Sequence, residues 1–321
     1  MPPQQPIRIG TRGSKLALTQ SGMMRDRIAA ALGCPQGASA EEVATYAVLV
    51  TITTTGDRIQ DRRLLEIGGK ALFTKEIEEA LLDGRVDAAV HSMKDVPAEQ
   101  PPGLAIAAIP EREDPRDAFV SLTYGAMAEL PHGARLGTAS LRRQAQALHV
   151  RPDLEIVMLR GNVDTRLAKL EAGEADAILL AASGLNRLGL GGVVKSFLDP
   201  VAFPPAPGQG ALAIQTRLED RDAAWAVALR CEATTLAVTA ERGAMTALEA
   251  SCRTPIGAHG RFVDGRLRLL VEALSPDGAK RFRQDGDAEL ADDPHTQAFD
   301  LGLALGKDVQ SAGGDAIVLE D

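Results

Sequence analysis

The sequence is poor in aromatic residues, in cysteine and in positive charge. Only 3% of its 321 residues are Phe, Trp or Tyr, so its cores must be built from Ala, Val, Leu and Ile. The formal net charge of −9 argues against a nucleic-acid-binding protein, because polyanions select for a basic surface. Three cysteines (Cys34, Cys231 and Cys252) form an odd, sparse set that fits a reducing compartment better than a disulfide framework.

Signals for export and for membrane insertion are also missing. Residues 1–6 have neither a basic n-region nor an apolar h-region. No uninterrupted apolar run approaches ~20 residues, so no membrane span is expected. The sequence therefore predicts a cytoplasmic protein, and its length predicts two or three domains at roughly 150 residues each.

Strands and helices are expected to alternate over the first two thirds of the chain. The expected strands are 7–10, 46–52, 86–90, 104–109, 135–137, 155–159 and 177–181. Three helices are expected to begin after caps at Ser14, Thr74 and Ser140. A fourth is expected over 163–172, and a fifth from the end of strand 177–181 through Leu188. The Pro-bounded segments 110–116 and 203–210 interrupt this alternation. Such a pattern favours mostly parallel sheets, which bind ligands at the carboxyl ends of their strands.

The last ~90 residues follow a different pattern, typical of an α+β unit. Helices are expected over 234–250 and 294–307, and strands over 257–262, 267–274 and 280–284. Asp264-Gly265 and Asp277-Gly278 are hairpin-turn signals between these strands.

Arginines recur where an expected strand leads into an expected helix. They are Arg12, Arg142, Arg143, Arg160 and Arg166, with Ser14 and Ser140 as neighbouring caps. Cations in a first helical turn oppose the helix dipole, so this placement argues for an anionic ligand. A surface arginine near an ordinary cap is the alternative at Arg12, and a solvated basic face is the alternative at Arg142 and Arg143. Phosphate competes with a ligand that bears several carboxylates.

Two further stretches carry candidate chemistry. Residues 91–97 directly follow an apolar strand, which makes Asp95 a candidate catalytic carboxylate and Lys94 a candidate anion contact. A polar turn with a Lys–Asp pair is the alternative. Cys252 lies on an expected loop beside Arg253, which could lower the pKa of its thiol, although an inert loop residue would look the same. No Cys or His lies at ligand spacing nearby, so no metal site is expected.

Taken together, these stretches resemble the porphobilinogen deaminases (hydroxymethylbilane synthases), in the same order and over nearly the whole chain. The motifs that carry the resemblance are 11–14 with 16–18 and Gln20, 68–70 with 72–73, 91–97, 111–118, 140–144, 159–162 with 165–167, 207–210, and Cys252 with 255–257. No single motif is decisive, whereas the ordered set is highly specific.

The resemblance implies a fold and a reaction. It implies two lobes similar to type 2 periplasmic binding proteins, domain 1 (1–110 with 211–230) and an inserted domain 2 (111–210), followed by domain 3 (231–321). It implies a dipyrromethane cofactor joined to the Cys252 sulfur by a thioether. Four porphobilinogen molecules would be added with loss of ammonia, and a linear hydroxymethylbilane would be released by hydrolysis. The family resemblance also favours a monomer.

The matching positions imply roles for individual residues. Asp95 would be the catalytic residue. The cofactor would be bound by Lys94, Ser140, Arg142 and Arg143, and the substrate by Arg12, Ser14, Arg160, Arg166 and Gln209. A lid would include Lys70 and Phe73. The sequence departs from the family at Ala250-Ser251, where Gly-Gly is usual, at Glu66, where some members have Lys, and at Asp164, which replaces a common Gly.

Two other functions remain open from the residues alone. A periplasmic solute-binding protein would share the two lobes and an anion cleft, but not a third domain with a cysteine. A phosphate-handling transferase would need a glycine-rich phosphate loop, and the Arg12-Gly13-Ser14-Lys15 stretch has the wrong spacing for one.

Overall fold

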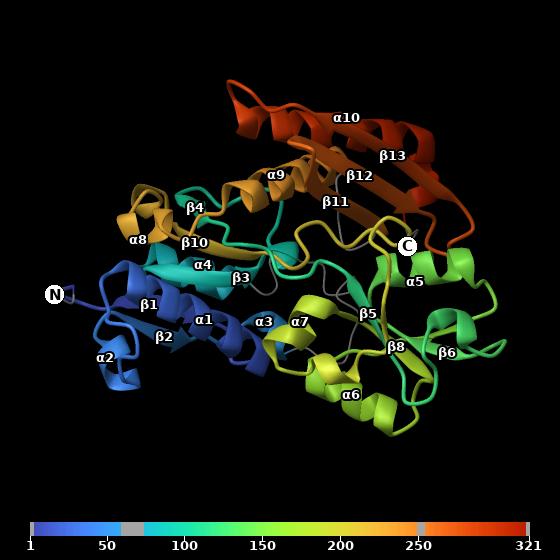
Figure 1. The fold of residues 1–321 in the computed structure, drawn as a ribbon, viewed down its shortest axis with the longest axis horizontal. Helices are drawn as coiled ribbons and strands as arrows, with labels where there is room; N and C mark the ends of the chain where they lie inside the picture. The colour runs from blue at the N-terminus through green and yellow to red at the C-terminus, as the bar shows by residue number, and fades with distance from the viewer. Residues whose placement is uncertain (1–2, 59–73, 249–253, 319–321) are drawn as a thin grey trace. The chain divides into compact units, whose positions relative to one another are not determined.

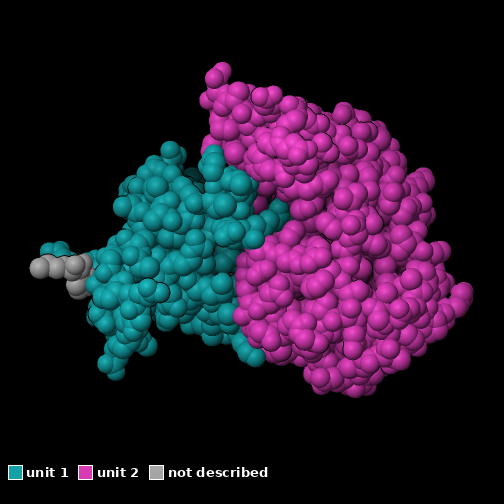
Figure 2. Space-filling view, in the orientation of Figure 1, with its two compact units in different colours: residues 1–63, 67–112, 211–235 teal, residues 64–66, 113–210, 236–321 magenta. Residues whose placement is uncertain are grey.

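The computed structural model describes residues 3–58, 74–248 and 254–318. The described residues form two compact units, which Figure 2 colours separately. One contains the residues up to 112 together with 211–235, and the other contains 113–210 together with the residues from 236 onward.

The first unit is built on a five-stranded sheet of order β2-β1-β3-β10-β4. Its strands are β1 (Ile7–Thr11), β2 (Ala47–Thr51), β3 (Ala88–Ser92), β4 (Leu104–Ala108) and β10 (Leu212–Arg217). Four of them run in one direction, because β10 is antiparallel to both of its neighbours and the other pairings are parallel. This agrees with the expected mostly parallel sheet.

Helices cover both faces of this sheet (Figure 1). They are α1 (Lys15–Ala31), α2 (Ala40–Ala44), α3 (Thr55–Arg58), α4 (Lys75–Leu82) and α8 (Ala224–Val227). Ile28 of α1 and Trp225 of α8 share a core with Val90, whereas Ile77 of α4 shares a second core with Ala89. Adjacent residues of β3 thus point to opposite cores, which is why the strand is apolar at successive positions.

The second unit repeats this sheet order with different strands, β7-β6-β8-β5-β9. They are β5 (Asp117–Val120), β6 (Arg135–Gly137), β7 (Glu155–Val157), β8 (Ala177–Ala181) and β9 (Ser196–Phe197), with helices α5 (Leu141–Val150), α6 (Val163–Glu171) and α7 (Ala182–Arg187). Here β5 takes the place of β10, since it is antiparallel to β8 and β9. The repeat is one of topology, and the sequence shows no internal repeat.

The C-terminal part of the second unit has the expected α+β pattern. An antiparallel sheet of β11 (Ile256–Val263), β12 (Arg266–Leu274) and β13 (Arg281–Ala288) shares a core with α9 (Glu232–Ala247) and α10 (Pro294–Gly313). The β11–β12 loop consists of Asp264 and Gly265, both with positive φ (50° and 78°), as the sequence predicts for this hairpin. Gly302 of α10 lies so close to α9 that a Cβ there would be 1.8 Å from the Ala240 carbonyl oxygen.

Local signals predicted the starts of α1, α4 and α5 correctly, and two of the three expected side-chain caps are present. Ser14 and Ser140 cap α1 and α5 through their side chains, as expected. α4 also begins directly after Thr74, as expected, but the predicted cap is wrong in that the Thr74 side chain makes no cap hydrogen bond. No described helix combines the length and apolar character needed to cross a bilayer.

Candidate functional site

Two of the candidate segments lie at the carboxyl edge of the first sheet. Arg12 directly follows β1, and a 3-10 turn, Met93–Asp95, directly follows β3. β1 and β3 are neighbours and run parallel, so their ends lie at the same edge. The structure therefore brings Arg12, Lys94 and Asp95 to one edge, although they are about eighty residues apart in the sequence.

The N-terminus of α1 offers a favourable setting for an anion beside Arg12. The Ser14 Oγ accepts a hydrogen bond from the Ala17 backbone N–H at 3.3 Å. A buried hydrogen bond from Ser21 Oγ to Thr11 Oγ1 at 2.7 Å joins the helix to the end of β1. The first turn of α1 has no acidic residue, so the helix dipole there is not compensated by a carboxylate of its own helix.

The Asp95 turn presents its carboxylate from a fixed backbone. Met93 and Val96 are buried, whereas Asp95 is exposed and Lys94 half-buried. The Met93 N–H donates to the Ala211 carbonyl at 3.0 Å, and this bond ties the turn to the start of β10. The backbone that bears Asp95 is thus held by the buried Met93 and Val96 and by the hydrogen bond to Ala211.

The second sheet carries an equivalent set of cations at its own carboxyl edge. β6 and β7 are parallel neighbours, and they lead to the α5 and α6 N-termini respectively. Asn162 caps α6 by accepting from the Thr165 N–H at 2.8 Å. Arg166 Nε donates to the Gly161 carbonyl at 2.9 Å, which holds the Arg166 stem against the strand-to-helix turn.

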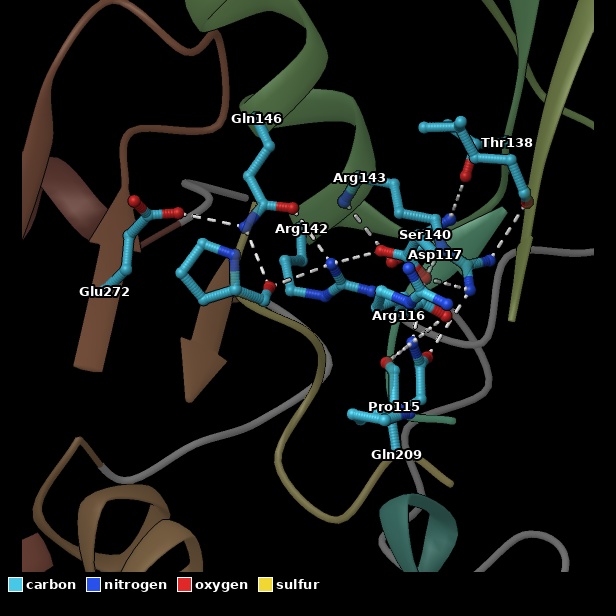
Figure 3. Close-up of polar contacts among 12 residues, drawn as sticks. Pro115, Arg116, Asp117, Thr138, Ser140, Arg142, Arg143, Gln146, Gln209 and Glu272 are labelled. Carbon is cyan, nitrogen blue, oxygen red and sulfur yellow. Dashed lines mark hydrogen bonds and ion pairs between the residues drawn. The ribbon is translucent and has the colours of Figure 1, made fainter. Parts of the chain in front are cut away.

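A buried carboxylate lies between the two adjacent arginines of α5 (Figure 3). Asp117, at the start of β5, accepts from Arg142 Nη1 at 2.7 Å through Oδ2 and from Arg143 Nη2 at 2.8 Å through Oδ1. Gln209 Nε2 donates to the same Oδ1 at 2.9 Å. The sequence argued for an external anion between these cations, and the structure places an internal one there.

Electrostatics keep this cluster ionised. Burial of Asp117 opposes its charge, but the two guanidinium groups outweigh that effect and hold the pKa of Asp117 well below its usual range. One negative and two positive charges leave the three side chains with a net charge of +1. The cluster therefore still attracts anions after its internal pairing.

The two arginines differ in how completely their donors are used. Arg143 donates through Nε and Nη2 to Asp117 and through Nη1 to the Leu179 carbonyl. Within the described residues, Arg142 donates through Nη1 alone, to Asp117, the Gln146 side chain and the Pro204 carbonyl. Its Nε is buried and has no hydrogen-bond partner within the described part of the chain. The Nη1 of Arg160, also buried, is likewise unpartnered among the described residues.

The C-terminal sheet contacts α5 one helical turn beyond Arg142, at Gln146. Gln146 Nε2 donates to the Pro204 carbonyl and to Glu272 Oε1, both at 2.9 Å. Glu272 is fully buried on β12 and also accepts from Arg283. A continuous polar network therefore leads from β12 through Gln146 to Arg142 (Figure 3).

Three of the predicted site residues, Cys252, Lys70 and Phe73, lie outside the described residues. Sequence reasoning missed the role of Asp117, although the residue belongs to the motif 111–118. The available signal was a carboxylate at the start of an apolar strand, 117–120, where an unpaired charge would be costly to bury.

The chemistry of the donors favours an organic anion over a metal. Among the residues that the structure describes, no group of three or more His, Cys, Asp or Glu side chains could hold a metal ion. The groups at the two carboxyl edges include guanidinium donors, helix N-termini and the exposed carboxylates of Asp95 and Asp164. Such a set can bind several carboxylates and stabilise a cation beside Asp95.

Comparison with known protein families gives two matches that together span most of the chain. The family model described as "Porphobilinogen deaminase, dipyromethane cofactor binding domain" matches residues 7–224, and "Porphobilinogen deaminase, C-terminal domain" matches residues 235–311. A porphobilinogen deaminase of Caulobacter vibrioides (strain NA1000 / CB15N) is 68% identical over 319 residues, which cover 99% of both chains. One from Phenylobacterium zucineum is 68% identical over 321 residues, 99% of this chain and 100% of the relative.

Comparison with solved structures gives similarities at low TM-scores to two binding proteins. A periplasmic substrate-binding protein of an ABC transporter from Coxiella burnetii is 15% identical and covers 74% of this chain and 96% of its own, with a TM-score of 0.42. A nutrient binding protein from Burkholderia cenocepacia bound to methionine is 14% identical and covers 70% and 89%, with a TM-score of 0.41. The strand orders of the two five-stranded sheets define the fold of the chain.

Proposed function

The chain belongs to the porphobilinogen deaminase family, and we propose that it condenses four porphobilinogen molecules, with loss of ammonia, into a linear hydroxymethylbilane. The observation that carries this proposal is the 68% identity to named family members over 99% of the chain. Membership in this family brings with it a dipyrromethane cofactor, which we place on the sulfur of Cys252.

The described residues fit such a group. Each pyrrole unit of the growing chain bears an acetate and a propionate, so the ligand is a polyanion. Arg142 Nε and Arg160 Nη1 are buried donors without a partner among the described residues, and a carboxylate would satisfy them. When bound, the dipyrromethane supplies the pyrrole carbon from which the product chain grows.

The donor counts suggest different roles for the two arginines of α5. Arg143 is saturated by Asp117 and Leu179, so we assign it to holding Asp117 and the start of β5 in place. The buried Nε of Arg142 has no partner among the described residues, and Nε is one arm of the side-on fork that binds carboxylates in a bidentate manner. We therefore assign direct carboxylate binding on this helix to Arg142, with Ser140 and the N-terminus of α5 beside it.

Arg12, Ser14 and Lys94 form the corresponding anion-binding set in the first unit, and Arg160 and Arg166 complete that of the second. Gln209 acts indirectly, since its amide holds Asp117 Oδ1 and the Pro115 carbonyl at 2.9 and 2.7 Å. These assignments give each cation a carboxylate-binding or supporting role. We also expect Lys70 and Phe73 to belong to a lid.

Asp95 is the catalytic residue of the proposal. Loss of ammonia from the aminomethyl group of porphobilinogen places positive charge on the pyrrole nitrogen, and formation of the new carbon–carbon bond does so again. A carboxylate within hydrogen-bond reach of that N–H stabilises the charge at both steps and accepts or returns a proton. Asp95 is exposed, and the turn that carries it is anchored by the buried Met93 and Val96. Stabilising a charge on the substrate requires an accessible carboxylate on a rigid backbone of this kind.

The test is the intact mass of the denatured protein. The wild type should exceed its sequence mass by two linked pyrrole units, and Cys252→Ser should not. Cys34→Ser and Cys231→Ser are matched controls that should keep the surplus, because neither cysteine is assigned to the cofactor. If the bare chain gained no mass on incubation with porphobilinogen, the proposed reaction would be wrong.

The expected monomer and cytoplasmic location stay predictions. Light scattering of the purified protein at two concentrations tests the first, and cell fractionation tests the second.

A further inference from the structure

A buried polar network underlies the Asp95 turn and is separate from the arginine sites. His91, on β3, contacts Gln215 of β10, with 3.1 Å between Nε2 and Oε1. Gln215 is fully buried, and its Nε2 donates to Gln100 Oε1 at 2.9 Å and to Glu78 Oε1 at 3.3 Å. Gln100 Nε2 in turn donates to the Pro97 carbonyl at 3.2 Å, two residues beyond Asp95.

Counting donors fixes the protonation pattern of this network. The two N–H bonds of the Gln215 amide are both used, by Gln100 and Glu78, so its oxygen faces His91 as an acceptor. The His91 Nε2 must then carry the proton. The hydrogen bonds therefore run in one direction, from His91 through Gln215 and Gln100 to the Pro97 carbonyl.

The charged groups around His91 favour a neutral ring. Arg12 approaches from the end of β1, Glu78 lies across Gln215 on α4, and Lys94 and Asp95 follow on the same turn. Burial lowers the pKa of His91 to about 4, the hydrogen bond to Gln215 opposes this shift, and the charge of Arg12 adds to it. His91 thus adds no positive charge beside the cations that meet the substrate.

We propose that His91, as a neutral Nε2–H tautomer, is a positioning residue that fixes the backbone of the Lys94–Asp95 turn through Gln215, Gln100 and the Pro97 carbonyl. This inference rests on the proposed role of Asp95 in turnover. The network links three elements of the first unit, β3, β10 and α4, to the one loop that bears the catalytic carboxylate. The imidazole acts through the turn and does not touch the substrate.

The first test compares two substitutions at His91. In His91→Gln the side-chain amide nitrogen takes the place of Nε2 and can still donate to Gln215, whereas His91→Leu leaves the Gln215 oxygen buried and unpaired. We expect His91→Leu to lower kcat about 10- to 100-fold with little change in KM, as for a misplaced catalytic group, and His91→Gln to stay within a few-fold of the wild type. His132→Leu, at an exposed loop position, is the control and should leave both constants unchanged.

The proposal would be overturned by equal losses of kcat in His91→Gln and His91→Leu, or by full kcat in His91→Leu. Intact mass measured on the same samples separates this from failure of the proposed function. A variant that carries the cofactor surplus but turns over slowly has lost positioning, whereas a wild type without surplus or turnover refutes the function itself.

The second test needs no activity and applies even where His91→Leu fails to fold. In wild-type protein, ¹⁵N NMR of the His91 ring should show the Nε2–H tautomer without titration between pH 5 and 8. Gln215→Glu places a carboxylate against the ring and should raise the pKa of His91 into that range, which the same NMR titration measures. An Nδ1–H tautomer, or titration near the ordinary value of 6.5 in the wild type, would refute the proposal.

Discussion

Replacement of Asp117 by asparagine tests the internal charge balance of the second unit. The substitution keeps the shape of the side chain but removes the only carboxylate between Arg142 and Arg143 among the described residues, and all three side chains are about 95% or more buried. The amide oxygen can still accept from one arginine, while its N–H₂ group faces the donors of the other. Breaking one partner of a buried ion pair costs about 3–5 kcal/mol, so we expect Asp117→Asn to lower the free energy of unfolding by that amount.

Urea unfolding at pH 7, followed by circular dichroism, measures this loss. With an m-value of about 3 kcal/mol/M, the midpoint should fall by about 1–2 M for the transition that unfolds the second unit. Asp114→Asn is the matched control, three residues away, because the side chain of its partner Arg116 is 40% exposed and such pairs contribute about 0–1 kcal/mol. A loss for Asp117→Asn no larger than that of Asp114→Asn would refute the reasoning.

Three further predictions follow from single features of the structure. Asp95→Asn should keep its thermal midpoint, because the side chain is exposed, but should lose at least about 100-fold in kcat; near-normal turnover would remove Asp95 from the mechanism. The stabilisation from Asp117 should be complete above about pH 4 and lost as the pH falls further, since its pKa lies below the ordinary 3.8; thermal midpoints of wild type and Asp117→Asn that fail to converge in acid would contradict this. Gly302→Ala should cost about 1–3 kcal/mol in thermal or urea unfolding because its Cβ would meet the Ala240 oxygen of α9, whereas Gly192→Ala, whose Cβ meets no atom within 4 Å, should be neutral.

The elements predicted from sequence were those whose signals are local. The caps at Ser14 and Ser140 and the Asp264-Gly265 hairpin each depend on a few consecutive residues, and all three are present. Three strands have no sequence prediction: β5, β9 and β10. Of these, β5 and β10 occupy equivalent places in their sheets and run antiparallel to their neighbours. β10 pairs with β3, more than a hundred residues earlier in the chain, so its neighbours are not evident from local pattern.

The features of the candidate site also divide into those that local sequence predicts and those that depend on long-range contacts. The arginines after strands β1, β6 and β7 could be located from sequence, because residues that follow parallel strands share an edge of the sheet. Which of these arginines has a donor left for a ligand could not be predicted from sequence. The pairing of Asp117 with Arg142 and Arg143 depends on where β5 enters the second sheet, and the tautomer of His91 depends on Gln215 reaching it from β10.

The sequence by itself determined the family, the positions of the cations and the carboxylate Asp95 as the catalytic candidate, since these lie in contiguous motifs. Only the tertiary structure decided which arginine has an unused donor, which carboxylate compensates the pair on α5, and what holds the Asp95 turn. The physical reason is that a buried hydrogen bond or ion pair requires two groups within about 3 Å, and long-range strand pairing sets that distance.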